Sequence, residues 1–98
     1  MESAGVLVRF EAKPDKVDEV DVLLRALVAQ VHREESTIAW FGFRLGPTTF
    51  GVFHVFADAA GREAHLAESD EAMKANASEL FTAAPAVDFV DIVAANLP

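Results

Sequence analysis

The chain has 98 residues, of which 52% are apolar and 24% are charged, a composition typical of a folded globular protein rather than a disordered one. Eight basic against sixteen acidic residues give a formal net charge of -8, which repels phosphate backbones and anionic lipids; we therefore expect no nucleic-acid and no membrane partner. The chain contains no cysteine, which excludes disulfides, thiolate zinc sites and a cysteine nucleophile. Its first residues include neither a basic segment nor a long apolar segment, so we expect no signal peptide and a cytoplasmic location.

The first third of the chain predicts a strand followed by a helix. Apolar residues alternate over residues 5–12, with Val6, Val8 and Phe10 on one side, as in a half-buried strand. Pro14 follows, and because its fixed backbone angle suits a first helical turn, we expect a helix from there to about residue 34. One apolar stripe runs along this helix at three- and four-residue intervals and consists of Val17, Val20, Leu24, Leu27, Val28 and Val31.

The rest of the chain predicts a hairpin, two helical pieces and a last strand. These elements span residues 37–45 and 48–56 for the hairpin, a short helix capped by Asp58, a second helix from Ser69 or Asp70 to about residue 83, and residues 87–95 for the strand. The order is β-α-β-β-α-β. Residues 1–98 therefore predict one domain of the α+β class with the ferredoxin-like plan, whose second helix is split in two.

The predicted hairpin is apolar on both of its faces. Phe50, Val52 and Phe56 share one face, whereas Phe53 and Val55 share the other. A strand that is apolar on both faces requires cover on both, and helices can cover only one face of such a sheet. We therefore expect a second copy of the chain on the other face, as a homodimer. The alternative is a monomer whose exposed sheet face would be prone to aggregation.

Three polar side chains stand out on predicted apolar faces. Asn76 lies three residues from Met73, on the helical stripe that should face the sheet, so it is either a structural amide tied to the backbone or a donor that lines a cavity. His65 shares a helix face with Arg62 and is either a surface histidine or a base for proton transfer. His54 lies within an apolar strand, which favours a core position with a satisfied hydrogen bond.

Other kinds of site have no support in the sequence. The three histidines, at positions 32, 54 and 65, show no metal-binding spacing, and the acidic residues are scattered, so we expect no metal. There is no glycine-rich phosphate loop and no nucleophile motif of the GxSxG type. The aromatic residues of the hairpin are explained either as core or as the walls of a site for a planar organic ligand.

The chain resembles the antibiotic biosynthesis monooxygenase family, whose members are small dimeric α/β-barrel proteins that include quinol monooxygenases and anthrone oxygenases. The resemblance spans nearly the whole chain. It rests on the order and spacing of five segments: EAKPDK at residues 11–16, the apolar helix that ends in HREES, the aromatic hairpin, EAHL at residues 63–66 and MKAN at residues 73–76.

The resemblance implies an oxidoreductase without a cofactor, in which O2 oxidises a deprotonated phenol or quinol in an apolar pocket. It implies His65 and Asn76 as the catalytic residues. Substrate-binding residues would be Trp40, His54, Phe56, Arg62 and Met73, with the aromatic members as pocket walls.

Two departures qualify the resemblance. His54 and Phe56 occupy the positions of a Glu-x-Trp pair that is frequent in the family, which implies a changed pocket floor. Leu7 and His65 replace an asparagine and a tryptophan of the haem-degrading relatives, which argues against haem degradation. Two functions follow as hypotheses: a monooxygenase acting on a hydrophobic quinol, anthrone or polyketide-like aromatic, or a non-catalytic dimeric barrel that binds a small hydrophobic ligand or serves as an accessory subunit.

Overall fold

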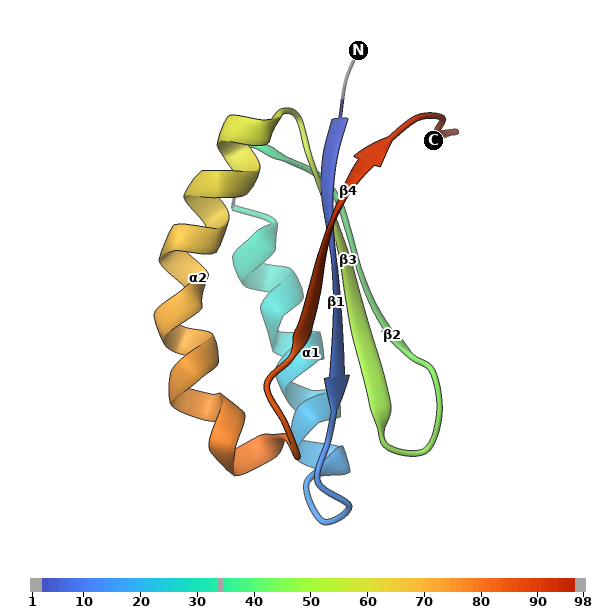
Figure 1. The fold of residues 1–98 in the computed structure, drawn as a ribbon, viewed down its shortest axis with the longest axis vertical. Helices are drawn as coiled ribbons and strands as arrows, with labels where there is room; N and C mark the ends of the chain where they lie inside the picture. Colours follow the sequence, from blue (N-terminus) through green and yellow to red (C-terminus); the bar gives the residue numbers. More distant parts are fainter. Residues whose placement is uncertain (1–2, 34, 97–98) are drawn as a thin grey trace.

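The predicted order of elements is confirmed in a computed structural model of the chain (Figure 1). The structure describes the backbone of residues 3–33 and 35–96; the side chains of residue 3 and of residues 67–77 lie outside that description. The elements are β1 (Ser3–Glu11), α1 (Val17–Val31), β2 (Thr37–Arg44), β3 (Thr49–Phe56), α2 (Ala59–Leu80) and β4 (Ala86–Ile92). They form the expected ferredoxin-like α+β fold.

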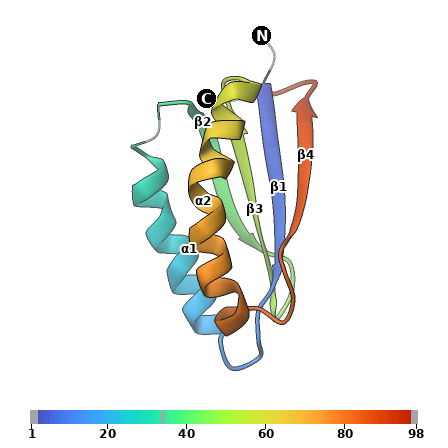
Figure 2. The same cartoon turned by 60° about the vertical axis from the view of Figure 1, so that its left-hand side comes forward.

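The four strands form one antiparallel sheet in the order β2-β3-β1-β4. Val8, at the centre of β1, pairs with Val52 on β3 and with Val87 on β4. Both helices lie on the same side of this sheet (Figure 2), where α1 packs against β2 and α2 packs against β1 and β3. No described helix is both long enough and apolar enough to cross a membrane.

The core lies between this helical layer and the sheet. Alternate residues of β1 and β3 enter it, and Phe50 and Phe56 are 2% and 0% exposed. Val20 and Leu24 come from the apolar stripe of α1. Val28, which the stripe predicts to be buried, is instead 53% exposed, because it lies beside β2, the edge strand, beyond which no further strand packs.

Helix α1 begins later than predicted. Residues 13–16 form a turn in which the Lys16 N–H donates to the Lys13 carbonyl at 2.8 Å, and the helix begins at Val17 and ends at Val31. The Lys13 N–H donates to the carbonyl of Leu80, and that of Ala12 donates to Thr48. These bonds hold the chain before Pro14 against neighbouring elements, so the proline lies in a turn and not in the first helical turn.

Helix α2 is continuous, so the predicted split is wrong. Asp58 is an N-cap as expected, since its Oδ1 accepts a hydrogen bond from the Gly61 N–H at 2.8 Å. The helix then runs through Ser69 and Asp70 to Leu80. Neither glycine nor proline occurs between residues 62 and 80, and serine or aspartate inside a helix costs only about 0.7 kcal/mol relative to alanine. The last strand, β4, spans Ala86–Ile92 and not the predicted residues 87–95.

The second face of the sheet is apolar and has no cover among the described residues. Phe41 on this face is 53% exposed. Next to it, the Phe43 ring lies over Gly51, where an added Cβ would come within 2.4 Å of the ring. The expectation of a hairpin that is apolar on both faces is therefore confirmed; its cover by a second copy stays a prediction.

Candidate functional site

His54 lies in the core on β3, opposite Val6 on β1 and Trp40 on β2. It is 3% exposed, which confirms the expected core position. Its Nε2 lies 2.8 Å from the Thr37 hydroxyl, and the two groups share one hydrogen. The bulge in β2 next to Thr37 brings this hydroxyl to the level of the imidazole.

His65 brings a second imidazole to the same place. The first half of α2 lies over β3, and the ring of His65 meets the ring of His54 edge-on at a centroid distance of 4.5 Å. Phe56 contacts both rings, stacked on His54 at 3.9 Å and tilted against His65 at 5.3 Å. His65 is half-buried and faces the sheet, so the geometry does not fit a purely surface histidine. Imidazoles exchange protons readily near neutral pH, and this pair could pass a proton from the surface of α2 towards Thr37.

Arg62 precedes His65 by one helical turn and reaches the other half of the sheet. Its Nη1 donates to the carbonyls of Gly5 on β1 and Val90 on β4, both at 3.3 Å. Its guanidinium carbon lies 4.8 Å from the centre of the Phe89 ring. The Nε of Arg62 is buried and finds no hydrogen-bond partner among the described residues. A buried unpaired donor on a cation is costly, so Arg62 holds its place between α2 and the sheet at an energetic cost.

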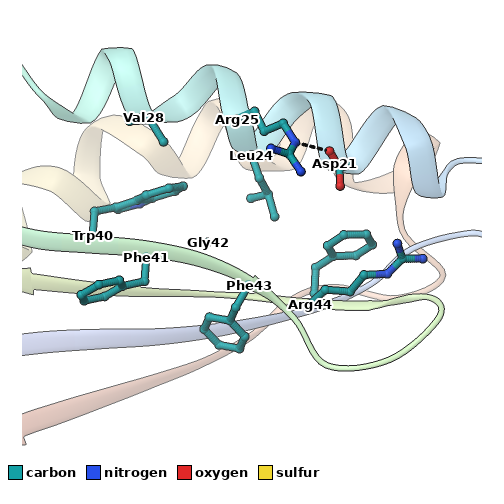
Figure 3. A pocket seen from close by; sticks show the side chains of 10 residues that line it. Asp21, Leu24, Arg25, Val28, Trp40, Phe41, Gly42, Phe43 and Arg44 are labelled. Atoms are coloured by element: carbon teal, nitrogen blue, oxygen red, sulfur yellow. Dashed lines mark hydrogen bonds and ion pairs between the residues drawn. The ribbon is translucent and has the colours of Figure 1, made fainter.

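A groove of about 420 Å³ separates α1 from β2. Asp21, Leu24, Arg25 and Val28 line it from the helix, and residues 40–44 line it from the strand. Figure 3 shows Trp40 and Leu24 inside the space between the two elements, with Phe41 and Phe43 on the far side of the strand. We call this space the α1–β2 groove.

A smaller groove of about 240 Å³ continues on the other side of Trp40, between Val28, His32 and Ile38. Among the predicted site residues, Trp40 lines both grooves, whereas His54, Phe56, Arg62 and His65 line neither.

The structure thus brings together His54, Phe56 and His65 and places Arg62 one turn away. The side chains of Asn76 and Met73 lie outside the described residues. The expected convergence of His65 and Asn76 on one cavity therefore stays a prediction.

The charged rim of the α1–β2 groove, formed by Asp21, Arg25 and Arg44, was not predicted from the sequence. Arg25 donates through Nε to Asp21 at 2.5 Å, and this bond, followed by weaker effects that include the charge of Arg44, lowers the pKa of the Asp21 carboxyl. Arg44 lies across from them at the end of β2. Gly42, between two aromatic residues of a strand, was a usable signal, because glycine inside a strand marks a close approach. Among the side chains that the structure describes, those of residues 4–33, 35–66 and 78–96, there is no group of three or more metal-ligating residues.

No protein-family model matches the chain, and no curated protein matches it. Several solved structures match the chain. A Nitrosomonas europaea protein of unknown function, NE2512, is 40% identical, with a TM-score of 0.92 over 100% of this chain and 96% of that one. An antibiotic biosynthesis monooxygenase is 23% identical, with a TM-score of 0.78 over 93% of this chain and 99% of that one.

A third structure is that of a Caulobacter crescentus protein proposed to be such a monooxygenase; it is 20% identical, with a TM-score of 0.79 over 94% of this chain and 91% of that one. The chain belongs to the same family as NE2512. The 40% identity to NE2512 carries this assignment, whereas the two monooxygenase structures show that the chain shares their ferredoxin-like fold.

Proposed function

We propose that this protein belongs to the antibiotic biosynthesis monooxygenase family and is a cofactor-independent monooxygenase that uses O2 to oxidise a hydrophobic quinol, anthrone or polyketide-like aromatic. The observation that carries the proposal is the contact of the two imidazoles of His54 and His65 at 4.5 Å, with Arg62 one helical turn away. Such a reaction requires a base for the substrate proton and a donor for the oxyanion that forms.

His65 is the base in this proposal. It takes the proton from an acidic C–H or O–H of the substrate, and the resulting imidazolium can share the charge with the neighbouring His54, which is anchored by Thr37. The substrate anion then transfers one electron to O2, and the two radicals join in a C–O bond. The peroxide loses water to leave a carbonyl, so that one oxygen atom enters the quinone and the other leaves as water.

Arg62 holds the oxyanion in this proposal. Two strand carbonyls fix its Nη1, so the positively charged guanidinium keeps a constant position one helical turn from His65. A preorganised charged donor needs no reorganisation when charge develops on the substrate oxygen. Phe89 below the guanidinium is 61% exposed and offers an aromatic surface to the substrate ring.

The homodimer is part of the proposal. The uncovered apolar face of the sheet, which includes Phe41, supports it, since a second copy would bury this face. The dimer would leave the helical layer, and with it His65 and Arg62, on its outside.

A second candidate function is a non-catalytic dimeric barrel that binds a hydrophobic ligand or serves as an accessory subunit. The tight packing of Phe56 on His54 at 3.9 Å favours it, because rings in contact leave little room for a substrate between them. The two candidates differ in whether O2 is consumed.

The test is incubation of purified protein with a panel of quinols and anthrones under 18O2, followed by mass spectrometry and O2 electrode measurements. The monooxygenase predicts the gain of one labelled oxygen per product. His65→Gln should lower kcat by about 10² to 10⁴, the usual contribution of a general base. His32→Gln removes an exposed imidazole outside the cluster and should leave kcat unchanged.

Arg62→Met should lower kcat more than it raises KM, since it removes an interaction with the developing charge. Asn76→Ala tests the remaining predicted catalytic residue. Saturable binding of the same compounds without O2 consumption would refute the monooxygenase and support the binding protein.

A further inference from the structure

The α1–β2 groove lies apart from the groups assigned to the proposed reaction, because neither His65 nor Arg62 lines it. Its volume of about 420 Å³ falls in the range of small-molecule pockets. Its walls are apolar near the centre, where Trp40 faces Leu24 and Val28 across the groove (Figure 3). Val28 is 53% exposed, so the helix leaves apolar surface uncovered here.

Gly42 determines the shape of this groove. A Cβ at this position would lie 3.1 Å from the Cη2 atom of Trp40 and 3.7 Å from the Cβ of Leu24. An added Cβ would therefore require the indole to move by a few tenths of an ångström, and a larger side chain would displace it from its place along the strand beneath α1. The result is a flat aromatic wall, which suits a flat aromatic ligand because stacked rings gain about 0.5 to 1.5 kcal/mol beyond their buried area.

The charge at the rim is opposite to that of the whole protein. Two guanidiniums, of Arg25 and Arg44, and one carboxylate, of Asp21, line the groove, whereas the chain as a whole carries a net charge of -8. The Asp21 Oδ1 already accepts a hydrogen bond from the Arg25 Nε at 2.5 Å. A ligand with its own acidic group would meet a net positive rim here and would be repelled by most of the remaining surface.

Arg44 is held in place for such a contact. Its Nε donates to the Gly46 carbonyl at 3.0 Å, its Nη2 donates to the Pro47 carbonyl, and its guanidinium carbon lies 5.2 Å from the Phe50 ring. The remaining nitrogen, Nη1, has no bond to any of the described residues. A guanidinium fixed by its neighbours loses little freedom when it binds a carboxylate.

We propose that the α1–β2 groove binds a planar aromatic carboxylate, with the ring against Trp40 and the carboxylate on Arg44. The proposal is independent of the monooxygenase reaction, because Trp40 lies in the groove and His65, Arg62 and Phe56 do not. It assigns the groove a ligand class: two fused aromatic rings, or three, with one acidic group at the edge.

The chain provides its own reporter for the test. Trp40 is the single tryptophan, so the indole Nε1–H gives one NMR cross-peak, which reports on the wall of the groove. We would titrate the full chain with naphthalene-2-carboxylate and with naphthalene-2-carboxamide, which has the same shape without the charge. The carboxylate should shift the indole peak and bind about tenfold more tightly than the amide, as expected for a charge-assisted hydrogen bond.

Variants separate the charge from the shape. Arg44→Gln should remove the preference for the carboxylate, whereas Arg33→Gln, which removes an exposed guanidinium outside the groove, should keep it. Gly42→Val should weaken both probes, since its side chain would occupy the place of the indole. Should Arg44→Gln fail to fold because the β2–β3 turn loses its brace, raising the salt concentration on the unaltered protein should reduce the preference instead.

An unmoved indole peak at millimolar carboxylate would overturn the proposal. So would equal affinities for the two probes, or a preference that survives in Arg44→Gln. Loss of O2 consumption in the reaction assay would leave these results unaffected, so the failure of one proposal is distinguishable from the failure of the other.

Discussion

Replacement of Phe41 by glutamate should prevent the chain from forming a homodimer. Phe41 is 53% exposed on the uncovered face of the sheet. A phenylalanine side chain can bury about 200 Å², so roughly 100 Å² is available to a partner, worth about 2.5 kcal/mol at 25 cal/mol per Å². In a two-fold dimer each Phe41 counts once per chain, which gives about 5 kcal/mol per dimer.

This loss corresponds to an increase of the dimer dissociation constant by roughly three to four orders of magnitude, and burial of the new carboxylate adds to it. Sedimentation velocity between 0.1 and 100 µM measures the change. We expect the unaltered chain to be a dimer in the micromolar range and Phe41→Glu to be a monomer. Val22→Glu is the matched control, because Val22 is 66% exposed on α1, in the opposite layer of the molecule, and should leave the dimer intact.

Two results would refute this reasoning. A monomeric unaltered chain at 100 µM would mean that the apolar face alone does not drive association. Equal dissociation constants for the unaltered chain and Phe41→Glu would mean that the chains associate through another surface, and disruption by Val22→Glu would identify the helical layer as that surface.

Three further predictions concern stability. Phe56→Ala removes a fully buried ring and should lower the free energy of unfolding by about 3 to 5 kcal/mol in urea titrations; a loss below about 1 kcal/mol would contradict the packing described. Asp58→Ala should cost about 1 kcal/mol through the lost cap of α2, and Asp58→Asn, which keeps an acceptor, should cost clearly less. Hydrogen bonds from Thr48 and then Thr49 lower the pKa of Glu11 from its ordinary value of 4.5, so its stabilising contribution is present above pH 4.5 and is lost as the pH falls through the folded-state pKa; an NMR titration midpoint at or above 4.5 would contradict this.

The sequence was sufficient for the fold because the local signals agree with one another. Alternation in residues 5–12 and the apolar stripe from Val17 to Val31 predict the strand and helix that the structure contains, and the hairpin follows from its β-rich segments. The predicted ends of helices and strands were wrong where contacts between distant parts of the chain determine them. The turn at residues 13–16 is fixed by hydrogen bonds to Leu80 and Thr48, residues that are distant in the sequence.

In helix α2 the prediction of two helical pieces was wrong because a local signal was given too much weight. Ser69 and Asp70 are good N-caps, and for this reason the sequence predicts that a second helix begins there. Yet a capping residue only permits a helix start and does not require one, and without glycine or proline the intervening residues continue the helix at small cost. The first half of this helix carries His65, whose ring meets that of His54 on β3.

The candidate site depended on strand register, which no local pattern specifies fully. The pairing of Trp40 with His54 places Trp40, a wall of the α1–β2 groove, next to His54 on the neighbouring strand, although the two residues are 14 positions apart. A one-residue slip of β2 would turn Trp40 to the uncovered face, exchange it for Phe41 and leave the groove without its aromatic wall. The bulge between Thr37 and Ala39 shifts the register at the first residues of β2, and the Thr37 hydroxyl lies within hydrogen-bond distance of the His54 imidazole. One irregularity in an edge strand therefore supports the histidine cluster, while the regular pairing that follows it keeps Trp40 in the groove.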